Sequence, residues 1–441
     1  MRVPLMVLLA ASIGWAQGPL PLSMKRAVEI ALAPDGSARA ALAQESIQQA
    51  QDRVAQAKAA FLPNLDTSVQ DRRQTTNLQA FGLGFGFILP VPGFSFPSLV
   101  GPFSVLDARA TAQQSVLNLS DVRKYQASKA MLAVVKFDND ATRSQVSDEV
   151  ARGYLACLRT DADRDTARAN VELSEALLAL ARRQLTVGTG TGIEVTRAEV
   201  QLANDRQRLI RAENDRARAV LQLLKSMGLR MDSSVEFTDK LVYKPVDPAS
   251  SEALLETARK TRFELKTQQQ REEAARLSHS AVKSERLPTI GVSGDYGAIG
   301  SDVVSSRATY TLGVSLRVPV FDGFRREARR EESFSQYKQE QIRTRDVGQQ
   351  IELQVRVALE SLRSASAEVD AAREGLSLAE NELAQARRRY EAGVGTSVEV
   401  TEAQTRLQRA RDNQVIALYD YNVARLDLAT ATGTIGEYLN Q

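Results

Sequence analysis

The sequence predicts a mainly helical protein with a small amount of β structure, built from two halves of one design. Three observations support this prediction. The segments 120–187 and 324–392 contain no proline, aromatic residues make up only 5% of the chain, and one block of sequence near residue 190 returns near residue 395. Long segments rich in Ala, Leu, Glu, Arg and Gln are typical of long helices and coiled coils. We therefore expect long helices joined in pairs.

The composition argues against several kinds of site. The net charge is +3 without a strong basic cluster, so we expect no nucleic-acid partner. The chain has one cysteine, Cys157, and one histidine, His279. A disulfide framework is impossible with one cysteine, and a Cys/His metal site or Cys–His dyad is not expected. We predict no catalytic residues, no metal site and no cofactor.

Residues 1–16 predict a cleaved secretory signal peptide. Arg2 supplies the positive start, residues 3–13 form a short apolar core, and Gly14-Trp15-Ala16 is a small-x-small cleavage site. A buried first helix is the alternative. No run of about 20 apolar residues follows, so any part of the mature chain that enters a membrane must do so as strands.

The rest of the chain predicts two structural repeats, 17–240 and 241–441. Residues 181–228 align with 386–433 without a gap, and both blocks end on glycine. Upstream, "FLPNLDTSV" resembles "RLPTIGVSG", and "SVLNLSD" resembles "PVFDGFR". Each half therefore reads as a helix, two strands, a very long helix, a glycine-rich turn and a second long helix. A period of this length indicates a duplicated domain rather than a solenoid repeat.

The first helix of each half is predicted to end at a Leu-Pro pair. These helices cover 23–60, with an interruption at 33–37, and 251–285. Pro63 and Pro288 terminate them, because the residue before a proline is pushed out of the helical region.

Two strands follow each of these helices. Segment 309–321 alternates cleanly, and segments 289–296, 65–73 and 108–117 alternate less regularly. A period of two over more than ten residues fits a transmembrane strand, with a small soluble hairpin in each half as the alternative. The Gly-, Phe- and Pro-rich insert 80–101 reads as a long hairpin loop that touches lipid or is simply flexible. The predicted lipid-facing side chains are Tyr310, Leu312, Val314, Leu316 and Val318.

The helices near the glycine-rich turns carry heptads. A period of 3.5 residues makes a left-handed coiled coil, and alanine along one row permits close helix approach. Each helix has only a narrow apolar stripe, which suits a wall one helix thick with water on both sides; a solid bundle is the alternative. The rows are Val400, Leu407, Gln414, Tyr421 and Leu428 with Ala403, Ala410, Ala417, Ala424 and Ala431, and Val195, Leu202, Leu209 and Leu223 with Ala198, Ala212 and Ala219.

Segments 187–193 and 392–398 predict the tips of two helical hairpins. "VGTGTGIEVT" looks like a phosphate loop, but no strand precedes it and no Lys-Ser/Thr follows, which argues against nucleotide binding. The glycines suit left-handed C-caps, the hydroxyl residues suit N-caps, and the glutamates suit the first turn of a helix. These residues are Gly188, Thr191 and Glu194, and in the second half Gly393, Thr396 or Ser397, and Glu399.

These features, in this order and twice over, resemble a TolC-type outer-membrane efflux protein. The signal peptide, "LPNL" and "LPTI" before the strands, "VFDGF" before the long helix, and the tips "LTVGTGTGIEV" and "YEAGVGTSVEV" carry the resemblance across essentially the whole mature sequence. The resemblance implies a homotrimer. Four strands from each subunit would complete a 12-stranded transmembrane β-barrel in outer-membrane lipid, and the long helices would form a hollow α-barrel in the periplasm.

The same resemblance implies the exit duct of a tripartite efflux or type I secretion system, not an enzyme. A periplasmic adaptor would meet the tips and connect them to an inner-membrane pump. A structural periplasmic coiled-coil or adaptor protein without a pore is the alternative, although adaptors usually have one hairpin. The residues that the resemblance implies for docking the adaptor are Gly188, Gly190, Thr191, Gly393, Gly395 and Thr396. Turn formation alone would also explain the glycines at these positions.

The resemblance also implies a gate at the periplasmic end. Glu399 and Glu402 stand three residues apart on one helix face and match two aspartates of the family prototype. Three subunits would bring six carboxylates near one axis, where bound cations or raised pKa values would relieve their repulsion. Ordinary solvated charge at a helix N-terminus is the alternative.

Two further residues match a link between the hairpins in the prototype. Tyr390 matches its linking tyrosine, and Glu194 matches the carboxylate partner in the other hairpin. Gly395 stands where the prototype has an arginine. The latch made by that arginine is therefore absent here or is shifted to Arg197.

Overall fold

The structure, a computed structural model, describes residues 20–81, 98–246 and 250–440. The predicted signal peptide and residues 82–97 of the insert lie outside the described residues. The chain divides into two compact units, and each takes segments from both halves of the sequence. The first unit contains 1–46, 136–266 and 345–441, and the second contains 47–135 and 267–344. The division at residue 240 follows the sequence repeat and stays a prediction.

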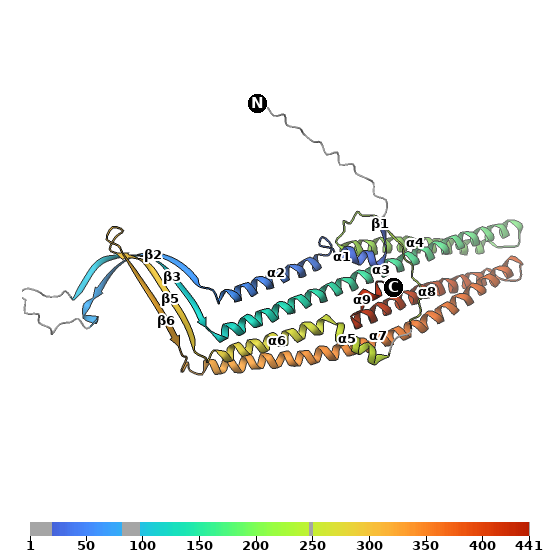
Figure 1. Cartoon of the computed structure of the whole chain (residues 1–441). Coiled ribbons are helices and arrows are strands. Elements are labelled where there is room, and N and C mark those ends of the chain that lie inside the picture. Colours follow the sequence, from blue (N-terminus) through green and yellow to red (C-terminus); the bar gives the residue numbers. More distant parts are fainter. Residues whose placement is uncertain (1–19, 82–97, 247–249, 441) are drawn as a thin grey trace, which may run out of the picture. The chain divides into compact units, whose positions relative to one another are not determined.

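The helices follow the predicted order in both halves (Figure 1). The two longest contain 69 and 67 residues, and the breaks near residues 33–37 and at Arg262 separate the short first helices from their neighbours. The first half has α1 (Met24–Ala31), α2 (Ala38–Ala59), α3 (Leu119–Val187) and α4 (Gly192–Met227). The second half has α5 (Ser251–Thr261), α6 (Phe263–Ser284), α7 (Arg325–Glu391), α8 (Ser397–Thr432) and α9 (Ile435–Tyr438).

Local chemistry sets several of these helix ends. The Ser23 and Ser250 side chains accept hydrogen bonds from backbone amides in the first turns of α1 and α5, which satisfies donors that a helix start leaves free. Gly228 and Gly433 are left-handed C-caps of α4 and α8, with φ of 75° and 72°. The two halves therefore begin and end their helices by the same means.

The four long strands form one antiparallel sheet in the order β2-β3-β5-β6. The halves join where β3 pairs with β5, so they do not form two separate hairpins. The strands are β2 (Asn64–Asn77), β3 (Leu99–Leu117), β5 (Thr289–Gly300) and β6 (Arg307–Arg317), beside a small parallel pair, β1 (Leu20–Leu22) and β4 (Val235–Phe237).

The two faces of the large sheet differ in polarity. Tyr310 pairs with Tyr296, and the predicted apolar side chains of β6 up to Leu316 are all exposed on that face. Val318 lies just past the end of β6. On the opposite face, Arg109 makes ion pairs with Asp107 at 2.8 Å and with Asp295 at 3.0 Å. The sheet thus has one apolar and one polar surface, both outside any core.

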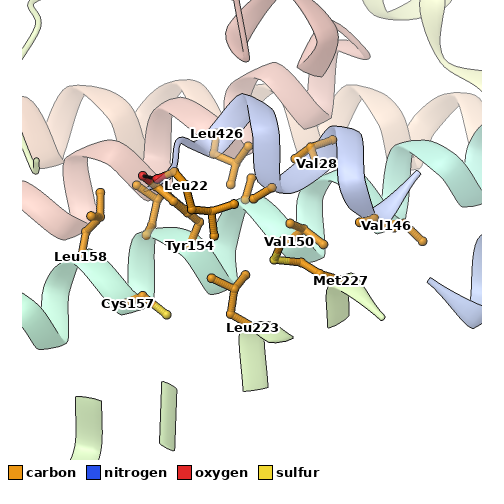
Figure 2. Close-up of a cluster of buried hydrophobic side chains, with 14 of the residues drawn as sticks. Leu22, Val28, Val146, Val150, Tyr154, Cys157, Leu158, Leu223, Met227 and Leu426 are labelled. Atoms are coloured by element: carbon orange, nitrogen blue, oxygen red, sulfur yellow. Dashed lines mark hydrogen bonds between the residues drawn. The ribbon is translucent and has the colours of Figure 1, made fainter. Parts of the chain in front are cut away.

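The largest core of the first unit packs around α3 (Figure 2). The Tyr154 hydroxyl lies 2.8 Å from both the Leu22 carbonyl oxygen and the Asp239 carboxylate. That carboxylate also accepts from the Met24 amide at 3.0 Å, which ties the start of α1 to the cluster. Buried apolar partners include Val28, Val146, Val150, Leu223, Met227 and Leu426.

Candidate functional site

The α3–α4 and α7–α8 hairpins end in the same turn. Gly188 has a φ of 83° and Gly393 a φ of 73°, which is the left-handed region that favours glycine. In each tip, the amide of the next glycine, Gly190 or Gly395, donates at 3.0 Å to the carbonyl oxygen six residues earlier. This bond closes the last turn of the incoming helix in the manner of a C-terminal cap. The predicted turn geometry is therefore present twice.

Gly190 and Gly395 are required for a different reason. A Cβ atom at 395 would lie 3.0 Å from the Cβ of Arg389, and one at 190 would lie 3.1 Å from the Cβ of Gln184. Around Gly188 and Gly393, by contrast, a Cβ atom would meet nothing within 4 Å. The first glycine of each tip is thus needed for its backbone angle, and the second for close packing on the helix end.

The outgoing helices are capped by side chains at equivalent positions. The Thr191 amide donates to the Glu194 carboxylate at 2.9 Å, and the Glu399 amide donates to the Thr396 hydroxyl at 3.3 Å. Ser397 is the first residue of α8, so Thr396 is the cap of this helix. Carboxylates in a first turn also complement the helix dipole. The Glu194 carboxylate therefore has a structural role in its tip, whereas Glu399 contributes its backbone amide to the cap.

Tyr390 lies between the two hairpins. The residue is 7% exposed and packs in a cluster that includes Val400 of α8 and leucines of α3. Burial, and then the nearby charge of Glu194, raises the pKa of the Tyr390 phenol. The phenol oxygen nevertheless has no hydrogen bond of acceptable geometry among the described residues. A hydrogen bond other than the expected Tyr390–Glu194 pair joins the two hairpins here. Gln184 Nε2 donates to the Tyr390 carbonyl oxygen at 3.2 Å.

A small cavity lies behind the tips, between the hairpins. Its volume is about 30 Å³, which suits one or two water molecules, since one needs about 10–15 Å³ by this measure. A nucleotide or prosthetic group would not fit. Arg197 lines the cavity and forms no ion pair with any of the described residues. The polar residues around the cavity are Ser174, Glu194, Arg197, Gln201, Tyr390, Ser397, Thr401 and Gln404.

The two predicted gate glutamates have different surroundings. The Glu399 carboxylate lies 3.4 Å from Arg389 Nε, and Arg389 also donates to the Val394 carbonyl oxygen at 3.4 Å. Glu402 is exposed, and its nearest cation is Arg406 at 3.7 Å on the same helix. Arg389 was not among the predicted site residues; it occupies the position equivalent to Gln184 in the first hairpin.

A buried polar cluster was also missed. Ser174 of α3, Asp205 of α4 and Gln404 of α8 are buried together behind the tips. A signal for it is present in the sequence. Asp205 stands in the row of alanines formed by Ala198 and Ala212, where the second half keeps alanine. An acidic residue in an apolar heptad row indicates a polar contact inside the helix pair.

Two features are absent from the described ranges of the chain. None of their helices combines the length and apolar character needed to cross a membrane. They also contain no group of three or more His, Cys, Asp or Glu residues placed to hold a metal ion.

Comparison with known proteins supports the resemblance to outer-membrane efflux proteins. The profile of the outer membrane efflux protein family matches residues 38–229 and 254–434. The chain is 24% identical over 311 residues to the outer membrane protein TolC of Vibrio cholerae, covering 67% of this chain and 69% of the relative. It is 23% identical over 331 residues to the alkaline protease secretion protein AprF of Pseudomonas aeruginosa, covering 72% and 68%.

The fold also matches a solved channel. The crystal structure of the Campylobacter jejuni CmeC outer membrane channel superposes with a TM-score of 0.78 at 15% sequence identity. The match covers 93% of this chain and 86% of that chain. The predicted fold class, mainly helical with a small β part and similar to channels of the TolC type, is confirmed.

Proposed function

The chain belongs to the outer membrane efflux protein family, and we propose that it is the exit duct of a tripartite efflux or type I secretion system. Its relatives are outer membrane channels of such systems, and family members are channel proteins rather than enzymes. The duct is passive. The energy for export comes from an inner-membrane pump, reached through a periplasmic adaptor protein.

The observation that carries the proposal is the sheet with one apolar and one polar face. Its edges are β2 and β6, and neither has a partner strand among the described residues. Long unpaired edges invite further pairing, and closed rotational symmetry removes them. Three copies that pair β6 of one subunit with β2 of the next form a 12-stranded barrel in the outer membrane, with Tyr310 towards lipid and Arg109 towards the pore.

The tips supply the contact with the adaptor in this proposal. Their six turns in a trimer expose backbone and small side chains, with Gly188, Gly190 and Thr191 in one hairpin and Gly393, Gly395 and Thr396 in the other. The geometry of the glycines supports a rigid, low-profile surface that a partner helix can approach closely. The long helices then form the periplasmic wall.

The gate lies just behind one set of tips in this proposal. Glu399 and Glu402 form it, and Arg389 neutralises part of the charge of Glu399. Tyr390 and Glu194 lie close together at the hairpin interface, and Arg197 lines the same cavity. Repulsion between six carboxylates around one axis favours bound cations, which would hold the closed end together.

Fractionation of expressing bacteria tests this proposal. The protein should appear in the outer membrane as a trimer whose first residue is Gln17, after cleavage of residues 1–16. The competing hypothesis is that the chain is a structural coiled-coil protein of the periplasm without a pore. In that case the protein should appear in the water-soluble fraction, with the apolar face around Leu312 and Val314 exposed to water.

A further inference from the structure

Arg109 is held between two carboxylates on the polar face of the large sheet. Its guanidinium pairs with Asp107, two residues away on β3, at 2.8 Å and with Asp295 of β5 at 3.0 Å. The side chains of Arg109, Asp107 and Asp295 are 26%, 26% and 19% exposed. Because the guanidinium is paired on both sides, it lies along the wall of the sheet and does not extend freely from it. The cluster therefore has a fixed position and one carboxylate charge in excess.

Gly297 makes this position of Arg109 possible. It lies directly opposite Arg109 in the register of β3 and β5. A Cβ atom at 297 would lie 2.4 Å from the Arg109 Cβ and 2.3 Å from the Ala108 carbonyl oxygen. Glycine in a strand often marks such a close approach. The missing side chain leaves the space across β5 that the guanidinium uses to reach Asp295.

The other charges of the polar face are not evenly distributed along the strands. Side chains two residues apart on a strand share a face. The register therefore places Asp66 of β2 on the polar face, because it lies opposite Thr111 of β3. The arginines of this face lie at its ends. Arg307 and Arg317 are the first and last residues of β6, and Arg72 lies beyond the part of β3 that pairs with β5.

The section in which β2, β3, β5 and β6 run side by side (Figure 1) thus has an excess of carboxylates between its ends. Among its described residues, Asp66, Asp107 and Asp295 are opposed there by Arg109 alone. Three subunits repeat this arrangement around the lumen of the proposed barrel. Charges on a wet wall act on ions over about 10 Å at an ionic strength of 0.1 M. Cations should therefore be enriched in this section and anions depleted.

We propose that Asp66, Asp107, Arg109 and Asp295 form a charge filter inside the barrel, and that Arg109 sets its strength. The filter rests on the proposed function, because it requires the polar face to line a lumen. It is separate from the proposed gate, whose residues lie on α8. The filter acts on solutes that pass through the open channel, and it favours cationic cargo over anionic cargo of the same size.

Arg109→Gln tests the filter by removing one positive charge from each subunit. Glutamine still offers a hydrogen-bond donor to the neighbouring carboxylates. We expect the ratio of cation to anion permeability, obtained from the reversal potential in a gradient of KCl, to rise about two- to fivefold. The rise should shrink at higher salt, because salt screens these charges. Arg109→Lys keeps the charge and should leave the ratio close to the wild-type value, which separates an effect of charge from an effect of packing.

Asp295→Asn should shift the permeability ratio in the opposite direction. This change removes one negative charge from each subunit and leaves the pair of Arg109 with Asp107 in place. Asp71→Asn is the matched control, because it is the same chemical change on the same sheet. Asp71 is the neighbour of Gln70, which lies opposite Asp107, so its side chain belongs to the apolar face. The permeability ratio should stay at the wild-type value in this control.

The contribution of the gate is separated by a second background. Arg109→Gln is combined with Glu399→Ala and Glu402→Ala, and a filter inside the barrel predicts a higher ratio of cation to anion permeability in this background as well. If wild type, Arg109→Gln and Asp295→Asn conduct with the same ratio, the filter is overturned and the duct is not. A wild-type protein that conducts no current would overturn the proposed function, and the filter with it.

Discussion

The Arg389 guanidinium and the Glu399 carboxylate lie 3.4 Å apart, on the two helices of a single hairpin. One of the two proposed gate carboxylates is therefore neutralised within its own subunit, before any neighbouring copy is considered. Arg389 also donates to a carbonyl oxygen of the tip, so the same side chain connects the turn with the gate. The other carboxylate, that of Glu402, is exposed, and its nearest cation is Arg406 at 3.7 Å.

Removing Arg389 should strengthen the block by divalent cations. In Arg389→Ala, Glu399 loses its partner, and the charge at the closed end becomes more negative. Exposed ion pairs contribute about 0.2–1 kcal/mol, which corresponds to a roughly one- to fivefold tighter block. Titration of divalent cations in planar bilayers measures this. The control is Arg387→Ala, which breaks an exposed pair with Glu391 within α7; a weaker block in Arg389→Ala would contradict the prediction.

Replacing both gate glutamates should have the opposite effect. Glu399→Ala combined with Glu402→Ala removes the proposed carboxylate ring, so conductance should rise and divalent block should weaken. Glu391→Ala, near the same tip on α7, serves as the control. If the double variant conducts and is blocked like the wild type, these two residues have no part in the gate.

Tyr390→Phe should leave both stability and conductance close to wild type. The phenol oxygen is buried and forms no hydrogen bond among the described residues, so its removal costs no hydrogen bond. Tyr390→Ala, by contrast, should cost about 3–5 kcal/mol, because it leaves a cavity between the hairpins. Thermal unfolding in detergent measures the difference. A marked rise in conductance for Tyr390→Phe would show that the hydroxyl bonds to Glu194 in the working channel.

Two glycine substitutions should change stability in opposite directions. Gly393→Ala puts a side chain on a residue with φ of 73° and should destabilise the tip by about 1–2 kcal/mol. Gly375→Ala lies inside α7, where a new Cβ meets nothing within 4 Å, and should stabilise by up to about 1 kcal/mol. Denaturation of the detergent-solubilised protein compares the two. Equal effects of the two substitutions on stability would mean that residue 393 does not have a left-handed backbone conformation.

Asp163→Asn should stabilise the protein at neutral pH. Burial, followed by the charges of Asp412 and Asp215, raises the pKa of the Asp163 carboxyl, against the opposing charge of Arg159. A carboxyl whose pKa is raised by folding lowers stability as pH rises through that pKa, and has no such effect below its unfolded pKa. The gain in melting temperature from Asp163→Asn should therefore be full at pH 7 and fade towards pH 4. An equal gain at both pH values would contradict it.

Much of the helical framework was predictable, because single residues mark its ends. Pro63 and Pro288 stop the first helices, and Gly188 and Gly393 mark the turns at the ends of α3 and α7. The strands were predicted less well. β3 begins at Leu99, nine residues before the predicted start at 108, since its first part has no regular alternation. The three-residue strands β1 and β4 were missed, because so short a segment shows no period.

The tip contacts could be predicted only in part. Capping residues follow from position in sequence, so Thr191 and Thr396 were identified. The pair Arg389–Glu399 and the burial of Asp205 depend on which face each helix turns towards its neighbour, and one sequence does not give that phase. In the sequence, Asp205 is visible as an interruption of the row of alanines. The packing of the helices then shows the polar contact that it makes.

Conductance of the purified full chain in planar lipid bilayers tests whether this protein is an export duct. We expect a detergent-solubilised trimer that inserts and conducts ions in discrete steps, with block by divalent cations that Glu399 and Glu402 control. A monomer that stays in water, binds no membrane and conducts no current would contradict it.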